Sequence, residues 1–157
     1  MVVTAIPSLQ DWRQGSVLPE SVARDLGLIT GDADMRCAVV VSHDCDIVNS
    51  VHEADLEVIV GTIVSEANGS LTGGKNSRKL HLSWIYRAKA QQVELCATDK
   101  RRLPKSALNA VLPDAGYSLE PQNLVTLRYW LAARYNRAAF PDEFNARLQK
   151  KTAVRKR

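Results

Sequence analysis

The sequence predicts an α+β domain, a small and mostly antiparallel β-barrel with C-terminal helices packed against it. The main observation is one of order: runs of β-branched residues fill the first two thirds of the 157 residues, and helical periodicity follows in the last third. A hydrophobic fraction of 45% and a charged fraction of 24% are ordinary for one globular domain. We expect this domain to span residues 1–146 and residues 147–157 to form a flexible basic tail.

The predicted strands are rich in Val, Ile and aromatic residues and are bounded by turn-forming residues. An unbroken apolar run such as RCAVVVS predicts a strand that is covered on both faces. Gly, Ser and Asn dominate residues 65–79 and predict an exposed loop. The expected strands are 12–18, 36–42, 56–64, 79–86 and 91–98.

The helices are predicted from caps, prolines and apolar spacing. Pro121 begins a helix over 121–139, in which Leu124, Leu127, Leu131 and Tyr135 form one stripe. Shorter helices are expected over 19–30, after a cap at Asp46, between Pro104 and Pro113, and after Pro141, where Phe144 and Leu148 provide an apolar face.

Composition and charge bound the class of protein. No apolar run reaches the roughly 18 residues of a membrane span, and the N-terminus lacks the features of a secretory signal. A cytoplasmic protein without a membrane partner is therefore expected. Three cysteines without CxxC spacing argue against a disulfide framework. The net charge of +4, concentrated in a basic C-terminus, is compatible with nucleic-acid contact.

The stretch AVVVSHDCDIVN places four residues that can bind protons or metals directly after a buried-looking strand: His43, Asp44, Cys45 and Asp46. If the strand continues through them, Asp44 and Asp46 share one face, and His43 and Cys45 share the other. Two carboxylates side by side suit a divalent cation such as magnesium, as in phosphodiester chemistry.

Other interpretations of this stretch remain open. His43 and Cys45 would bind zinc together with His52 and a fourth ligand such as Asp55. Alternatively, Cys45 would be a nucleophile with a neighbouring histidine as its base. A third interpretation ends the strand earlier and gives the aspartates only turn and cap hydrogen bonds. We expect no cofactor other than a divalent metal ion at the two aspartates.

The order of these segments resembles the MazF/PemK-type toxin family, whose fold is an SH3-like barrel with packed helices. QGSVL at 14–18 is similar to the early strand of that family. RCAVVVS at 36–42 is similar to its Arg-Pro pair followed by Val and Ile, with Cys37 in place of the proline. LEVIVGTIVS is similar to its second apolar strand, and TDKRRL at 98–103 to a segment before its closing helix. The similarity extends over residues 12–135.

The resemblance implies a ribosome-independent endoribonuclease. The family's arginine stabilises charge at the scissile phosphate, and a Thr or Ser after the second strand assists. Arg36 matches this arginine. The family's threonine falls near Val64, with Ser65 beside it and Thr62 two positions before.

We therefore expect a bacterial toxin or phage-defence component that acts on nucleic acid, with RNA favoured over DNA. In this hypothesis Arg36 stabilises charge at the phosphate and Ser65 assists. One of His43, Asp44 and Asp46 moves a proton or holds a metal. The backbone of the nucleic acid would contact the basic residues Lys75, Arg78, Lys79, Arg101, Arg102 and Arg128.

Two further functions remain open. One is a non-enzymatic subunit of a toxin–antitoxin or defence complex that binds a protein partner, such as an antitoxin or a second copy in a homodimer. The other is a metal-dependent phosphodiesterase that uses Asp44 and Asp46. Chelation of metal separates the two enzymes, because the reaction of the MazF/PemK-type family needs no metal.

Overall fold

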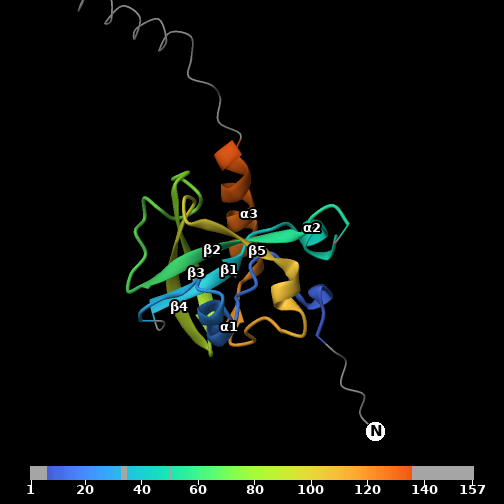
Figure 1. Ribbon diagram of the computed structural model, residues 1–157. Helices are drawn as coiled ribbons and strands as arrows, with labels where there is room; N and C mark the ends of the chain where they lie inside the picture. The colour runs from blue at the N-terminus through green and yellow to red at the C-terminus, as the bar shows by residue number, and fades with distance from the viewer. Residues whose placement is uncertain (1–6, 33–34, 50, 136–157) are drawn as a thin grey trace, which may run out of the picture.

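The computed structural model describes residues 7–32, 35–49 and 51–135, which form a strongly curled antiparallel sheet with helices on both sides (Figure 1). The strands are β1 (Arg36–Val40), β2 (Asp55–Val64), β3 (Lys79–Tyr86), β4 (Lys89–Cys96), β5 (Lys100–Pro104) and β6 (Tyr117–Ser118). The α-helices are α1 (Glu20–Asp25), α2 (Asp44–Val48) and α3 (Pro121–Tyr135), and the 3-10 helices are η1 (Leu9–Asp11) and η3 (Lys105–Leu108). The predicted α+β class is confirmed, with the sheet forming a half-barrel.

β2 is the strand that curls the sheet. One of its edges pairs with β1, and its other edge pairs first with β5 and then with β4. The remaining order is β4-β3-β6. Gly61 lies where β2 passes onto β4, and a Cβ at this position would stand 2.7 Å from Val93 and 2.9 Å from Leu95. The missing side chain therefore permits the close approach that the curl requires.

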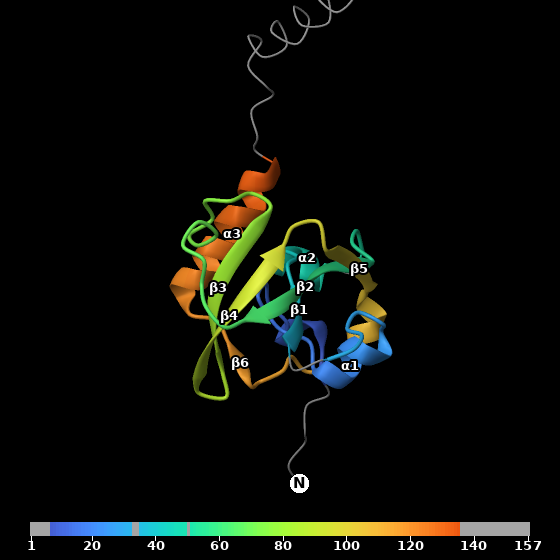
Figure 2. The same cartoon turned by 90° about the vertical axis from the view of Figure 1, so that its left-hand side faces the viewer.

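Two apolar clusters lie on opposite faces of the sheet, one beneath α3 and one beneath α1 (Figure 2). β1 contributes to both, because Cys37 and Val39 point into the first cluster and Ala38 and Val40 into the second. The prediction that this Val-rich strand is covered on both faces is confirmed.

The apolar face of α3 differs in part from the predicted stripe. Leu127 and Trp130 are buried against β3, and Leu124 and Leu131 are partly buried. Tyr135, however, is 72% exposed, so its assignment to the stripe is wrong. Trp130 joins the leucines in the core, and Tyr135 lies at the end of the helix, where its hydroxyl accepts a hydrogen bond from Lys100 at 2.7 Å. The predicted residues 136–139 of this helix and the helix after Pro141 lie outside the described residues.

The N-terminal segment is less regular than predicted. Within the predicted strand over 12–18, a turn at residues 14–15 comes first, and residues 15–18 then lie along β1 with the isolated bridge between Val17 and Val39. The predicted helix over 19–30 ends at Asp25 as α1, and Gly27 follows with φ of 67°. η3 lies in the interval predicted between two prolines. Within the part of the chain that the structure describes, no helix is long and apolar enough to cross a lipid bilayer.

Candidate functional site

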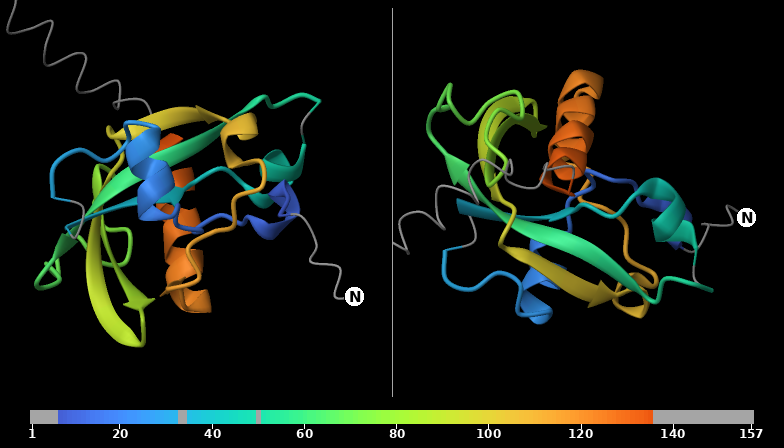
Figure 3. Two further views of the ribbon diagram at one scale, coloured as in Figure 1. Left: turned by 60° about the horizontal axis from the view of Figure 1, so that its bottom comes forward. Right: turned by 90° about the horizontal axis from the view of Figure 1, so that it is seen from above.

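The predicted catalytic residues lie at the two ends of β1. Arg36 begins the strand, whereas His43–Asp46 follow its other end, where α2 and η1 lie (Figure 3). The four residue steps of β1 alone span roughly 13 Å. The hypothesis that Arg36 acts together with Asp44 or Asp46 requires them to share one cleft, and it is wrong because an extended strand holds them apart.

The HDCD stretch is the start of a helix rather than the continuation of a strand. His43 is the N-cap of α2, and its side chain accepts a hydrogen bond from the Cys45 amide, so the cap is not Asp46 as predicted. Helical geometry turns positions two apart by about 200°, so Asp44 and Asp46 do not share a face. The paired-carboxylate arrangement needed strand geometry, and it is not formed.

Asp44 is held in a network that joins three parts of the chain. Its Oδ1 accepts a hydrogen bond from the Gln14 amide at 2.7 Å, and its Oδ2 accepts one from Arg128 at 2.8 Å. Arg128 also donates to the Gln14 side-chain oxygen at 3.0 Å. The buried Gln14 in turn donates to the Val41 carbonyl at 2.7 Å. This network ties α2 to α3 and to the N-terminal segment, and it occupies the Asp44 carboxylate.

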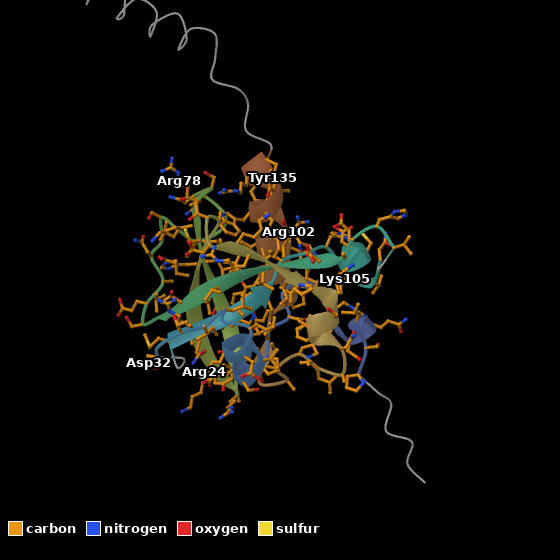
Figure 4. The ribbon with its side chains drawn as sticks, in the orientation of Figure 1. Arg24, Asp32, Arg78, Arg102, Lys105 and Tyr135 are labelled. Atoms are coloured by element: carbon orange, nitrogen blue, oxygen red, sulfur yellow. The ribbon has the colours of Figure 1, made fainter. Side chains whose placement is uncertain are left out.

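Lys105 is a structural residue that sequence reasoning missed. It is 5% exposed, and its ammonium group donates to the carbonyls of Asp46 and Asn49 at the C-terminal end of α2. A positive charge there is favourable because the last carbonyls of a helix carry partial negative charge. In the sequence PKSAL this lysine has the pattern of an ordinary surface residue, and only the fold brings it under α2 (Figure 4).

His43 and Cys45 are in direct contact. Nδ1 of His43 lies 2.7 Å from Sγ of Cys45, and both side chains are exposed. A nearby imidazole is the arrangement by which a thiol becomes a thiolate nucleophile. The zinc interpretation with His52 and Asp55 finds no support, because within the described ranges no three His, Cys, Asp or Glu side chains are placed so that they could hold a metal ion together.

Asp46 belongs to a separate hollow of about 210 Å³ whose lining is mainly acidic. It is lined by Ser42, Asp46, Glu53, Asp55, Glu57 and Arg102. Asp46 thus faces other carboxylates rather than Asp44. The two members of the predicted acidic pair have different surroundings and different partners.

At the other end of β1, Arg36 lines a larger hollow of about 640 Å³ together with Thr62, Asp99, Arg101 and Arg102. Arg36 and Thr62 are directly opposite in the β1–β2 register, so their side chains leave the same face of the sheet. Residues 26–28, after α1, form the apolar wall. We call this the arginine hollow.

The arginine hollow carries more positive than negative charge. Three guanidinium groups line it, against the single carboxylate of Asp99. Within the described ranges, Arg36 and Arg101 form no ion pair, and the 3.8 Å contact of Arg102 with Asp55 is weak and exposed. Guanidinium groups in such a concave surface suit phosphate oxygens, to which they can donate two hydrogen bonds each.

Thr62 lines this hollow, whereas Ser65, the residue chosen from the sequence, does not. Ser65 lies beyond the end of β2, three residues further along the chain. Thr62 was noted two positions before the place of the family's threonine, and its position opposite Arg36 depends on the strand register. The opposition of Arg36 and Thr62 is a pairing between distant segments, which local sequence does not reveal.

The remaining predicted nucleic-acid residues do not join Arg101 and Arg102. Arg128 is paired with Asp44, and Lys79 is paired with Glu94 at 2.8 Å. Lys75 is exposed in the loop before β3. Arg78 lines another hollow of about 430 Å³ with Thr98, Arg134 and Tyr135, toward the end of α3 (Figure 4).

The pair formed by Lys79 and Glu94 extends to a buried histidine. His81 is 6% exposed; its Nδ1 accepts from the Asn68 amide, so Nε2 donates to Glu94 at 2.9 Å. The hydrogen bonds from Lys79 and then His81 lower the pKa of Glu94 below its ordinary value. These groups stabilise the β3–β4 pair and leave no free carboxylate for catalysis there.

Cys37, which replaces the proline of the MazF/PemK-type pattern, is buried next to Arg36 in β1. Burial raises the pKa of its thiol to about 12, so this cysteine acts as an apolar core residue. No model of a known protein family matches the chain, and searches of curated proteins and of solved structures also found no match.

Proposed function

We propose that this protein is a toxin-type or phage-defence component that binds RNA at the arginine hollow and cleaves it. The observation that carries the proposal is the convergence of Arg36, Thr62, Arg101 and Arg102 in one concave surface with little opposing charge. Phosphate binding supplies most of the affinity of proteins for nucleic acids.

The relative placement of Arg36 and Thr62 also supports the resemblance to the MazF/PemK-type family and its SH3-like barrel. That family uses an arginine with an assisting Thr or Ser, and here the two residue types are opposite each other on adjacent strands. The curled antiparallel sheet with α3 against it is compatible with this kind of barrel.

RNA provides its own nucleophile, the 2′-hydroxyl group, so cleavage at this hollow would need no metal. The 2′-oxygen would form a bond to phosphorus while its proton passes to Asp99, the carboxylate of the hollow. The bond from phosphorus to the 5′-oxygen would break, and that oxygen would take a proton from water. Arg36 would donate to the phosphate oxygens as negative charge develops on them.

His43, Asp44 and Asp46 have no part in this reaction, because they lie at the far end of β1. The hypothesis of a metal-dependent phosphodiesterase required the carboxylates of Asp44 and Asp46 to lie side by side. The Asp44 carboxylate is instead bound to Arg128 and Gln14, away from Asp46.

The test is incubation of the protein with unstructured RNA in the presence of EDTA. We expect cleavage by the wild type and a loss of about 100-fold or more in the rate for Arg36→Ala, in the range of losing one transition-state donor. Arg13→Ala, at the other end of β1, is the control and should retain activity. Activity that disappears with EDTA would contradict the metal-free reaction.

A second function, protein binding without cleavage, is favoured by the outer face of α3. Val125 and Tyr129 are each 64% exposed one helical turn apart, which leaves an apolar strip facing solvent. Absence of RNA cleavage by well-folded protein under any metal condition would favour this non-enzymatic function.

A further inference from the structure

A small pocket opens beside the arginine hollow, and Arg36 lines both. The pocket has a volume of about 60 Å³ and lies between the start of β1, β4, β6 and the segment before β6. At about 10–15 Å³ for each water molecule, it has room for roughly four to six of them. That admits the edge of one base rather than a whole ring, since a cavity that encloses benzene has a volume of about 150 Å³.

The walls of the pocket combine aromatic and polar groups. Tyr86 and Tyr117 stack on each other with ring centroids 4.3 Å apart, and both line the pocket. Gln91 and Asp114 also line it. Aromatic rings with nearby hydrogen-bonding groups are the usual means of holding an unstacked base of single-stranded RNA.

Gln91 carries an observation that points to a ligand. Its Oε1 atom is buried and has no hydrogen-bond partner within the described ranges. A buried acceptor of this kind is normally satisfied by a donor, from the protein, from water or from a ligand. Asp114 adds a second acceptor: its Oδ1 accepts from the Gly116 amide at 2.8 Å, and no described residue donates to its Oδ2.

The two acceptors distinguish between the pyrimidines. Cytosine has an amino group on its pairing edge, and carboxylate or amide oxygens accept from it. Uracil has a carbonyl oxygen at the same position, which would face Gln91 Oε1 and Asp114 and be repelled. Tyr117 provides a donor for the cytosine ring nitrogen, and burial raises the pKa of this hydroxyl, which keeps it protonated.

We propose that this pocket binds the pairing edge of a cytosine of single-stranded RNA while Arg36, at its mouth, binds the phosphate of the same or the next nucleotide. The inference rests on the proposed function, because it assumes RNA in the arginine hollow. It adds that the protein selects its RNA by a base at this position.

The test measures binding of the full chain to fluorescent oligocytidylate and oligouridylate of equal length, over a series of salt concentrations. We expect the wild type to prefer oligocytidylate by about tenfold or more, the discrimination expected of one good base contact. Gln91→Leu should lower oligocytidylate affinity to the oligouridylate level while leaving the salt dependence unchanged. Gln122→Leu, at an exposed position of α3, should behave as the wild type.

Asp114→Asn is a second variant in case Gln91→Leu fails to fold. It retains Oδ1, and with it the bond to the Gly116 amide, but replaces the free acceptor by a donor. We expect its preference to shift toward uridine. Circular dichroism identifies any variant that is unfolded.

Different outcomes separate the two proposals. Equal affinity of the wild type for both oligonucleotides, or a cytidine preference that survives in both folded variants, would overturn the pocket assignment while leaving RNA binding intact. Loss of affinity for both oligonucleotides with a lower salt slope in Arg36→Ala would still support the arginine hollow. No binding of either oligonucleotide by the wild type would overturn both proposals.

Discussion

The two ends of β1 use their charged residues in opposite ways. At the α2 end, Asp44 is bonded to Gln14 and Arg128, and Lys105 is bonded to the carbonyls of α2. At the other end, Arg36 and Arg101 line an open hollow with no ion pair within the described ranges. The α2 end has the most residues that could bind protons or metals, but its main charged groups already form hydrogen bonds within the protein.

This difference follows from whether a charged group forms its hydrogen bonds within the protein or keeps them for a ligand. A charged group with several internal hydrogen bonds stabilises the folded chain, and a ligand would have to displace those bonds. An arginine that faces only water keeps its donors available for a phosphate. Removing charges at the α2 end should therefore lower stability, and removing them at the Arg36 end should lower binding.

The largest effect on stability is expected for Lys105→Met. The change keeps most of the side-chain volume but removes two charge-assisted hydrogen bonds to α2 in a buried position. We expect a loss of about 3 kcal/mol in the free energy of unfolding, measured by urea denaturation. Lys75→Met, at an exposed loop position, is the control, and an equal loss there would show that lysine removal in general is responsible.

A smaller effect is expected for Asp44→Ala. The Gln14 amide and Arg128 would both lose an acceptor, but the ion pair is partly exposed, which limits its contribution. We expect a loss of about 1–2 kcal/mol in the free energy of unfolding. Glu66→Ala, at an exposed position after β2, should change it by less than about 0.5 kcal/mol. RNA affinity should stay as in the wild type, and a selective loss of affinity would place a functional group at this end.

The smallest effect is expected for Glu94→Gln, and it depends on pH. The lowered pKa of Glu94 means that the carboxylate stabilises the fold above its unfolded pKa, near the ordinary value of 4.5, and that this is lost as pH falls. At pH 7 we expect a loss below about 1 kcal/mol, because solvent screens the pair with Lys79. Urea denaturation at neutral and acidic pH should show a weaker pH dependence in the variant, and an unchanged dependence would contradict this role.

The sequence predicted most of the sheet, and it predicted Arg36, Arg101 and Arg102 as candidate residues but not that they line one hollow. β1, β2 and β3 were predicted within two residues of their observed bounds, because continuous apolar runs such as that of β1 depend on local pattern. β5 was not predicted as a strand; it was noted only as part of the TDKRRL segment. In β5 the basic residues Arg101 and Arg102 are adjacent, and no apolar residue comes before Leu103. The strand therefore lacks the alternation of polar and apolar residues that predicts a half-buried strand.

The HDCD stretch shows why the pairing of the charged residues was not predicted. α2 has only five residues, too few for helical periodicity to appear, so strand alternation was applied to Asp44 and Asp46. The partner of Asp44, Arg128, is 84 residues away in the chain. Which charges are paired and which are free depends on such distant contacts, as does the opposition of Arg36 and Thr62.

The most direct test of the difference between the two ends compares Arg36→Ala with Arg128→Ala in the same two assays, RNA affinity across salt concentrations and urea denaturation. For Arg36→Ala we predict a loss of about tenfold or more in affinity, a reduction of about 0.7 in the salt slope for single-stranded RNA, and unchanged stability. For Arg128→Ala we predict lower stability and RNA affinity within about twofold of the wild type, since its charge is bound to Asp44. The opposite pattern, in which Arg128→Ala weakens RNA binding at full stability while Arg36→Ala leaves it intact, would contradict the account.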